Sequence, residues 1–494
     1  MVRTAFLLLA AALASAGTPE EAVRAFRRAY ESKDPTVRRK AVALLEEVAH
    51  PSATEALLPA LSDEDGRVRE RAREILLGRA ADADLEVMAR AGLRAPSPEA
   101  RRRCADALAL AAARAAPHAA ALEAALRDRE SVVREAAAAA LGAAGHRGSA
   151  PVVAAALRRE AVPEVQGALL LALDRLAPDE AAAEARRVPG RERDGPPAVA
   201  ALRVLGLRDP PGAARAGAVL LDHPAWEARA EAAAALAAHG SEGSAVEALI
   251  RALGREKRMR VREAIGAALE RLTGAPFGED IDRWNRWWKE KRDGWTPRTA
   301  PTAEGRPPGD GDSVARFYDI PIDGDRVVFV LDTSKSMLDP ARLGEKATKM
   351  EVAISHFAKT LADIRPGTGI NVVAFGTEVD AWRPRCAEAG PSSKYEALRF
   401  MQKHPLEGRT NIFDGLALAM SDREVDSVFL MTDGAPTAGE ETTRTGILRG
   451  LAHLRRWRPV RIHCVEVGAG NTGSRWRGFL AEVAAAAGGK FASK

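Results

Sequence analysis

Residues 326–336 read RVVFVLDTSKS, and this stretch decides the fold of the C-terminal third of the chain. Its first half, VVFVL, is a continuous run of β-branched and apolar residues, which is typical of a strand buried on both faces of a sheet. The second half changes at once to Asp332, Ser334 and Ser336, whose side chains carry oxygen atoms. The stretch therefore predicts a buried strand that ends in a polar turn.

Three more apolar runs follow, and amphipathic helical stretches separate them. The predicted strands are 327–331, 370–375, 428–431 and 461–467, and the predicted helices are 345–364, 393–403, 411–420, 443–456 and 475–487. Strands that alternate with helices in this way predict a doubly wound, Rossmann-like α/β domain with a mostly parallel sheet. In such sheets ligands bind at the carboxyl ends of the strands, where the strand order reverses.

Oxygen-bearing side chains gather at three such strand ends. Asp332, Ser334 and Ser336 follow the first strand, Thr410 opens a helix, and Asp433 follows the third strand. Two carboxylates and three hydroxyls are hard oxygen ligands, which suit Mg²⁺ or another small hard divalent cation. Because few protein charges surround it, such a cation could accept a carboxylate of a partner as its final ligand.

This pattern resembles a von Willebrand factor type A domain with a metal-ion-dependent adhesion site (MIDAS). The family motif is Asp-x-Ser-x-Ser, a distant Thr and a later Thr-Asp-Gly, and the chain has all three in this order. The resemblance implies acidic ligands at Asp332 and Asp433, the latter through water. It implies hydroxyl ligands at Ser334, Ser336 and Thr410.

Two features near the motif need a separate interpretation. Lys335 stands where Gly is common in the family, so its ammonium either weakens metal binding or points to solvent. Gly468, Gly470 and Gly473 form a Gly-x-Gly-x-x-Gly sequence between a strand and a helix, as dinucleotide-binding folds do. Too few residues follow Gly473 for a second βα unit with its ribose-binding acid, so we do not expect nucleotide binding.

Residues 19–275 repeat themselves. A small apolar residue that opens a helix recurs every 29 to 34 residues, at Val37, Val68, Ala100, Val133, Val165, Val199, Ala228 and Val261. An Arg follows it directly in six units, at Arg38, Arg69, Arg101, Arg134, Arg229 and Arg262. One helix pair cannot bury its apolar stripe alone, so neighbouring units are expected to stack into a solenoid.

The repeats resemble the HEAT family, whose Asp-x-x-Val-Arg signature is met closely around Val37. Their short units look like the compact bacterial variants of that family. An Ala-rich helical bundle without repeat order is the alternative. Most Arg and Glu side chains of the repeats are expected to form a solvated face with local ion pairs.

The domain plan follows from these patterns. We expect a signal peptide at 1–16, a HEAT-like α-solenoid of about eight repeats at 17–275, a Trp-rich capping helix at 276–295, a Pro/Gly linker at 296–312, and a von Willebrand factor A domain at 313–494. A first helix of the fold or an uncleaved anchor is the alternative for 1–16. An aromatic ligand box is the alternative for Trp284, Trp287 and Trp288, which share one helix face.

Composition and motifs exclude several function classes. The 73 basic and 68 acidic residues give a formal charge of only +5, so no nucleic-acid partner is expected. The three Cys are far apart and predict neither a disulfide framework nor a thiolate zinc site. No later segment is long and apolar enough to span a membrane. Since Gly-x-Ser-x-Gly, His-Glu-x-x-His and Walker sequences are all missing, we do not expect an enzyme.

We therefore expect a secreted or envelope-associated protein-binding module, of adhesion or scaffold type, released near Gly17 into the periplasm, the cell envelope or the medium. Its divalent metal would coordinate an acidic group of a protein partner. One alternative is a metal-independent scaffold that acts through the HEAT surface. Another is an accessory subunit of an ATPase or chelatase complex, which the signal peptide disfavours.

Overall fold

The computed structural model describes residues 18–188, 193–296, 315–341, 346–406, 408–468, 476 and 478–494. The predicted signal peptide, nearly all of the predicted linker and most of the glycine-rich sequence 468–473 lie outside these residues. The chain groups into two compact units. The first contains residues up to 254, 271–274 and 281–299, and the second contains residues 255–270, 275–280 and 300–494.

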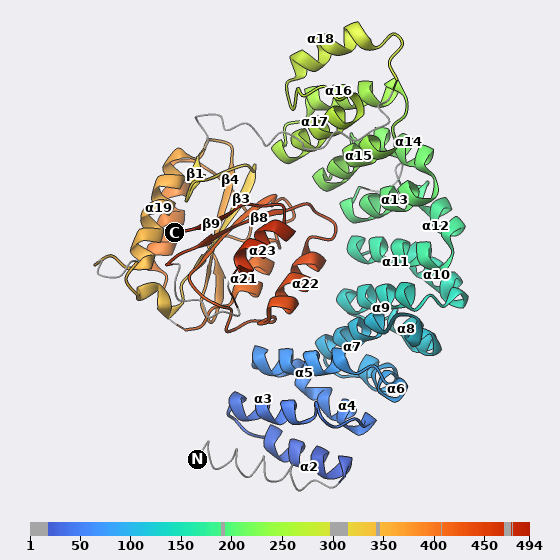
Figure 1. The fold of residues 1–494 in the computed structure, drawn as a ribbon, viewed down its shortest axis with the longest axis vertical. Coiled ribbons are helices and arrows are strands. Elements are labelled where there is room, and N and C mark those ends of the chain that lie inside the picture. Colours follow the sequence, from blue (N-terminus) through green and yellow to red (C-terminus); the bar gives the residue numbers. More distant parts are fainter. Residues whose placement is uncertain are drawn as a thin grey trace. The chain divides into compact units, whose positions relative to one another are not determined.

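The first unit is a stack of helix pairs in chain order (Figure 1). Its helices are α2 (Pro19–Tyr30), α3 (Pro35–Leu44), α4 (Pro51–Leu57), α5 (Gly66–Gly78), α6 (Asp82–Arg90), α7 (Pro98–Ala111), α8 (Ala119–Ala125), α9 (Ser131–Ala144), α10 (Ala150–Arg159), α11 (Pro163–Leu176), α12 (Pro178–Ala185), α13 (Gly195–Arg208), α14 (Pro210–Leu220), α15 (Trp226–His239), α16 (Gly243–Arg255) and α18 (Ile281–Lys291). From α3 to α15 each odd-numbered helix packs on the next odd-numbered one, and even-numbered helices pack beside them. This arrangement confirms the predicted all-α solenoid.

The residues that set the repeat period lie near the starts of the odd-numbered helices. All of them except Val37, which is half-buried, are fully buried. Several of these helices begin with a capping side chain; for example, the Asp65 carboxylate accepts hydrogen bonds from two backbone N–H groups in the first turn of α5. The period read from the sequence is therefore the period of the buried contacts between units.

In the units of Arg38 and Arg101, the Arg that follows the period-setting residue joins its unit to the next. Arg38 donates hydrogen bonds of 2.9 and 2.8 Å to the two carboxylate oxygens of Asp63, and Arg101 does the same with Asp128 at 2.7 and 2.9 Å. Each guanidinium also donates to two carbonyls in the turn before its own helix. Both Arg residues are buried. These two side chains are exceptions to the solvated face expected for most Arg and Glu residues of the repeats, because they bind inward to the turns.

Helix α18 packs on the unit through two of its tryptophans. Trp284 is fully buried and Trp288 is 8% exposed. Trp288 Nε1 donates to Glu247 Oε1 of α16 over 3.3 Å, and its ring lies against Gly243. Side chains in these positions cover the end of the helical stack, as a terminal cap does.

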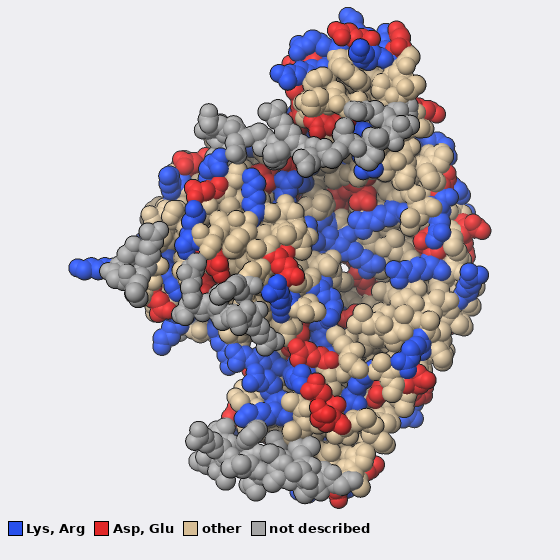
Figure 2. All heavy atoms as spheres, viewed as in Figure 1, with Lys and Arg blue, Asp and Glu red and all other residues tan. Residues whose placement is uncertain are grey.

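The visible surface of the helical unit carries Lys and Arg interspersed with Asp and Glu (Figure 2). This mixture agrees with the near balance of charge in the sequence. Among the described residues, no helix has both the length and the apolar character that a bilayer crossing requires.

The second unit is built on a mostly parallel sheet. Its strands are β3 (Arg326–Asp332), β4 (Gly369–Phe375), β5 (Val379–Ala381), β6 (Ala387–Glu388), β7 (Ser427–Thr432), β8 (Arg461–Glu466) and β9 (Phe491–Ser493). The order is β5-β4-β3-β7-β8-β9, with β6 beside β4. β4, β3, β7, β8 and β9 are parallel, and β5 and β6 run antiparallel to β4. A separate ladder joins β1 (Arg316–Phe317) to β2 (Ile320–Pro321).

Helices cover both faces of this sheet (Figure 1). α19 (Lys349–Asp363) and α20 (Pro391–Lys403) pack on one face, and α21 (Ile412–Ala419), α22 (Arg444–Leu454) and α23 (Phe479–Ala486) pack on the other. Side chains of β3 alternate between the two cores, with Phe329 in the first and Val328 and Val330 in the second. The apolar run of the sequence therefore forms the doubly covered strand that it predicted.

The strand order reverses between β3 and β7. From β3 the chain crosses through α19 to β4, and from β7 it crosses through α22 to β8 on the opposite side. The loops after these two adjacent strands therefore diverge and leave a crevice at their carboxyl ends. In doubly wound folds, ligands bind at this edge of the sheet.

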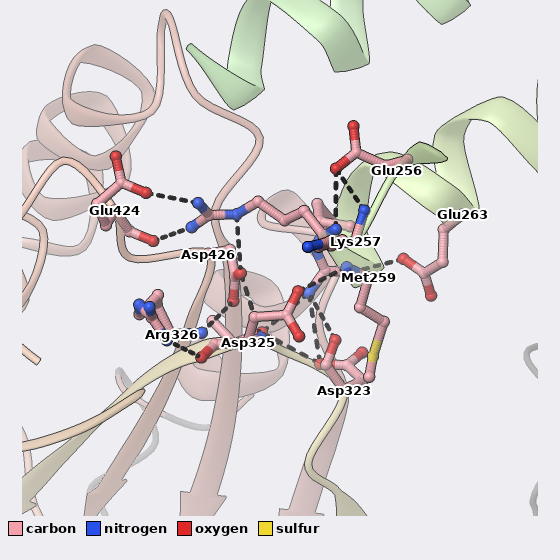
Figure 3. Close-up of polar contacts among 12 residues, drawn as sticks. Glu256, Lys257, Met259, Glu263, Asp323, Asp325, Arg326, Glu424 and Asp426 are labelled. Carbon is pink, nitrogen blue, oxygen red and sulfur yellow. Dashed lines mark hydrogen bonds and ion pairs between the residues drawn. The ribbon is translucent and has the colours of Figure 1, made fainter. Parts of the chain in front are cut away.

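The helix α17 (Met259–Thr273) begins in the second unit and ends in the first. Its first turn lies at the amino ends of β3 and β7, the edge opposite to the crevice (Figure 3). Met259 N–H donates to Asp325 Oδ2 over 2.5 Å, and Arg258, just before the helix, lies 2.6 Å from Glu424 and 3.4 Å from Asp426. The repeat pattern of the sequence, by contrast, predicts that this whole helix belongs to the solenoid at 17–275.

Candidate functional site

The motif side chains meet at the crevice between β3 and β7. Asp332 is the last residue of β3, Ser334 and Ser336 follow in the next turn, and Asp433 directly follows β7. The two strands pair in parallel, with Leu331 opposite Met431, so their ends lie at one edge of the sheet. Residues that are about a hundred positions apart in the chain thus become neighbours.

A chain of hydrogen bonds connects these residues. Asp332 Oδ1 accepts the Ser334 N–H over 2.8 Å, which turns the backbone sharply after β3. Ser334 Oγ and Ser336 Oγ lie 3.1 Å apart, and Ser336 Oγ donates to Asp433 Oδ1 over 2.8 Å. The four oxygen-bearing side chains therefore form one connected cluster.

Thr410 reaches the same place from the loop before α21. Its N–H donates to Thr437 Oγ1 over 2.9 Å, and its carbonyl accepts the Thr437 N–H over 2.8 Å. These bonds fix the loop against the segment that follows β7. A Cβ atom at Gly434 would lie 3.7 Å from Thr410 Oγ1, so the Thr410 hydroxyl lies beside the Thr-Asp-Gly segment.

Asp332 is the most deeply buried group of the cluster, with no exposed surface. Burial raises the pKa of its carboxyl to about 6, and the nearby Asp433 acts in the same direction, while hydrogen bonds from Ser334 and Thr432 oppose the shift. Within the described part of the chain, no cation lies at ion-pair distance from Asp332. A buried carboxylate in this position is destabilising unless it is protonated or a cation approaches it.

The donor set fits a small hard cation. In the described ranges no group of three or more His, Cys, Asp or Glu side chains is arranged to hold a metal ion. Hydroxyl oxygens would therefore have to supply most of the ligands, as Ser334, Ser336 and Thr410 can. Ser334 and Thr410 are 2% and 6% exposed, so their oxygens are shielded from bulk water.

The sequence motifs did not predict that two further residues, Thr432 and Lys349, take part in the cluster. The Thr432 hydroxyl donates to Asp332 Oδ2, opposite the oxygen that Ser334 holds. The Lys349 ammonium lies 2.6 Å from Asp433 Oδ2. Thr432 could have been found, because it belongs to the Thr-Asp-Gly motif. Lys349 has no such signal, since it is simply the first residue of a capped helix.

Lys335, by contrast, is exposed. Of the two interpretations that the sequence left open, the structure favours the one in which this side chain points to solvent. The glycine-rich sequence 468–473 lies outside the described residues beyond Gly468.

Comparison with known proteins agrees with the geometry. Residues 325–492 match the family of the von Willebrand factor type A domain, and residues 7–77 and 88–174 match HEAT repeats. The chain therefore carries HEAT repeats followed by a von Willebrand factor A domain, as its motifs predicted. Both are protein-interaction modules rather than catalytic domains by class.

The curated relatives match only part of this chain. The chain is 32% identical over 137 residues to the inter-alpha-trypsin inhibitor heavy chain H1 of Bos taurus, and 24% identical over 166 residues to the human von Willebrand factor A domain-containing protein 3A. These matches cover 25% and 34% of this chain but 14% and 13% of those proteins. A solved von Willebrand factor type A structure from Catenulispora acidiphila matches 35% of this chain and 40% of that chain, with 20% identity and a TM-score of 0.28.

Proposed function

We propose that the C-terminal domain binds one divalent metal ion, Mg²⁺ first among the candidates, and uses it to hold an acidic group of a partner protein. The ligands are Asp332, Ser334, Ser336, Thr410 and Asp433. The observation that carries the proposal is the buried Asp332 carboxylate, which has no cation partner in the described residues and adjoins a row of hydroxyl groups. A bound cation would supply a positive charge with a coordination position open to a carboxylate.

Hydrogen bonds within the protein hold the proposed ligands in fixed orientations before a cation binds. Both oxygens of Asp332 accept hydrogen bonds, from the Ser334 N–H and from the Thr432 hydroxyl, so the carboxylate cannot rotate freely. Ser336 is held by Asp433 in the same way. Ligands that are oriented before binding lose less conformational entropy when the cation arrives.

The helical unit supplies a second surface in this proposal. A solenoid presents a long row of helices, and such surfaces commonly receive protein partners. The proposed location outside the cytoplasm rests on residues 1–16 alone, whose basic residue, apolar run and Ala-Ser-Ala sequence are typical of a secretory signal.

A binding experiment distinguishes the metal-dependent function from a metal-independent scaffold. Full-length protein is immobilised and exposed to the envelope fraction of its source cells, with Mg²⁺ or with a chelator, and the bound proteins are identified. Capture that requires Mg²⁺ and is absent with Asp332→Asn supports the proposal. Capture that is equal with chelator and with Asp332→Asn would place the function on the solenoid surface instead.

A further inference from the structure

Lys349 is a buried cation at the edge of the oxygen cluster. Its residue is 6% exposed, and its Nζ lies 2.6 Å from Asp433 Oδ2, whose side chain is 1% exposed. The same Nζ is 3.5 Å from the Ser336 carbonyl oxygen and 3.8 Å from Asp339 Oδ2. Because the Asp433 side chain is shielded from water, this ion pair is weakly screened.

The fold leaves space for this ammonium on one side of Asp433. Oδ1 of Asp433 accepts the Ser336 hydroxyl, and Oδ2 accepts Lys349, so the two groups approach different oxygens of one carboxylate. Gly468 has a positive φ of 72°, and a Cβ atom there would lie 2.7 Å from Lys349 Cε. A glycine at this position therefore makes room for the lysine stem.

The ammonium changes the charge of the site. Of the proposed ligands, Asp332 and Asp433 together carry two negative charges, and Lys349 reduces this net charge to −1; the count leaves out the exposed Asp339 carboxylate, 3.8 Å from the same Nζ. A divalent cation then leaves the loaded site with a net charge of +1, where the same site without Lys349 would be neutral. Coulomb interactions between charges that are in contact, and whose side chains are shielded from water, are large enough to affect the binding of both a cation and an anion at this site.

We propose that Lys349 sets the specificity of the site: it weakens cation binding and strengthens the attraction of the loaded site for an anionic partner group. This inference rests on the metal-binding function proposed above. In this inference Lys349 lowers the affinity of the site for the cation. The same charge makes a partner carboxylate a more favourable ligand of the bound cation.

The chain provides a matched control in Lys335. This residue lies between the ligands Ser334 and Ser336 in sequence and has the same charge, but it is exposed. Lys335→Met and Lys349→Met therefore remove the same charge from the same region. Only Lys349→Met removes the contact with Asp433.

Calorimetric titration of the full-length chain with MgCl₂ tests the first part of the proposal, that Lys349 weakens cation binding. We expect Lys349→Met to bind Mg²⁺ about tenfold more tightly than wild type, while Lys335→Met stays within about twofold. Lys349→Gln should behave as Lys349→Met does, and Lys349→Arg should stay near wild type because it keeps the charge. Circular dichroism verifies that each variant is folded.

Acetate tests the second part of the proposal, that Lys349 strengthens the attraction of the loaded site for an anion. If acetate completes the coordination, it tightens Mg²⁺ binding by linkage, and we expect this effect to be larger in wild type than in Lys349→Met. An equal or larger effect in Lys349→Met, or none in wild type, overturns the anion half.

The failures are distinguishable. If wild type binds Mg²⁺ but Lys349→Met binds it with equal or lower affinity, the inference is wrong and Lys349 merely positions Asp433. If neither protein nor any variant binds Mg²⁺, the proposed function itself fails and the inference with it.

Discussion

Ser336 Oγ donates a 2.8 Å hydrogen bond to Asp433 Oδ1 and so joins two motif segments that are 97 residues apart in the chain. The contact exists because β3 and β7 are adjacent parallel strands whose following loops diverge. Without this strand order, Ser336 and Asp433 could not both contact one ligand. The relationship places the oxygen cluster at the reversal point of the sheet, where ligands bind in folds of this kind.

Asp332 should destabilise the domain when metal is absent. The folded-state pKa of about 6 lies above the usual Asp value of 3.8, so the folded state binds more protons than the unfolded state between these pH values. Stability from this group is therefore present at low pH and is lost as pH rises from about 4 to 6. Asp332→Asn removes the charge and should stabilise the chelator-treated protein at pH 7 by up to about 3 kcal/mol.

Thermal unfolding at several pH values measures this effect. The gain of Asp332→Asn over wild type should shrink towards pH 4, where the wild-type carboxyl is protonated. A variant that is less stable than wild type at pH 7 without metal would show that the carboxylate is not strained by burial.

The inward-facing arginines should hold successive repeats together. Arg101→Ala removes the paired hydrogen bonds to Asp128 and leaves this carboxylate with fewer partners, so we expect a loss of about 2 kcal/mol from the unfolding transition of the helical unit. Arg158→Ala is the control, because Arg158 pairs with Glu184 while more than half exposed and such pairs contribute little. Urea denaturation followed by circular dichroism compares them. Equal effects would mean that burial of the arginine does not matter.

The start of α17 should stabilise the C-terminal domain. Arg260 Nη2 lies 2.9 Å from Ser427 Oγ and 3.4 Å from Asp323 Oδ1. Burial acts to raise the pKa of Asp323, but His463, Arg260 and Arg461 together hold it well below its usual range. A fragment of residues 313–494 lacks Arg260 and also lacks the Arg258 partner of the buried Asp426.

We therefore expect a fragment of residues 255–494 to be more stable than one of residues 313–494, by about 3 kcal/mol. Denaturant unfolding of the two fragments gives the difference. Equal stabilities would show that α17 belongs energetically to the solenoid, as the repeat pattern predicts.

Much of this architecture is predictable from local patterns. The repeat period was visible because each period-setting side chain, from Val68 to Val261, must be small and apolar where units meet. The strand β3 was visible because a strand covered on both faces has no polar positions. Asp332, Ser334 and Ser336 were identifiable because close spacing in sequence already brings them together.

The remaining features depend on contacts between distant residues. Lys349 is one lysine among many until the fold brings it to Asp433, 84 residues away. The role of Arg38 depends on Asp63 in the next unit, and exposed and buried arginines look alike in the sequence. The short strands β5, β6 and β9 have two or three residues each, too few to show a period.

The most direct measurement is the calorimetric titration of Mg²⁺ into the full-length wild type and into Asp332→Asn. Our account predicts one bound ion per wild-type chain and no detectable binding to the folded variant, because the variant loses a direct anionic ligand of the cation. Equal affinity in the two proteins would contradict the account, since the metal would then bind elsewhere than at the cluster around Asp332.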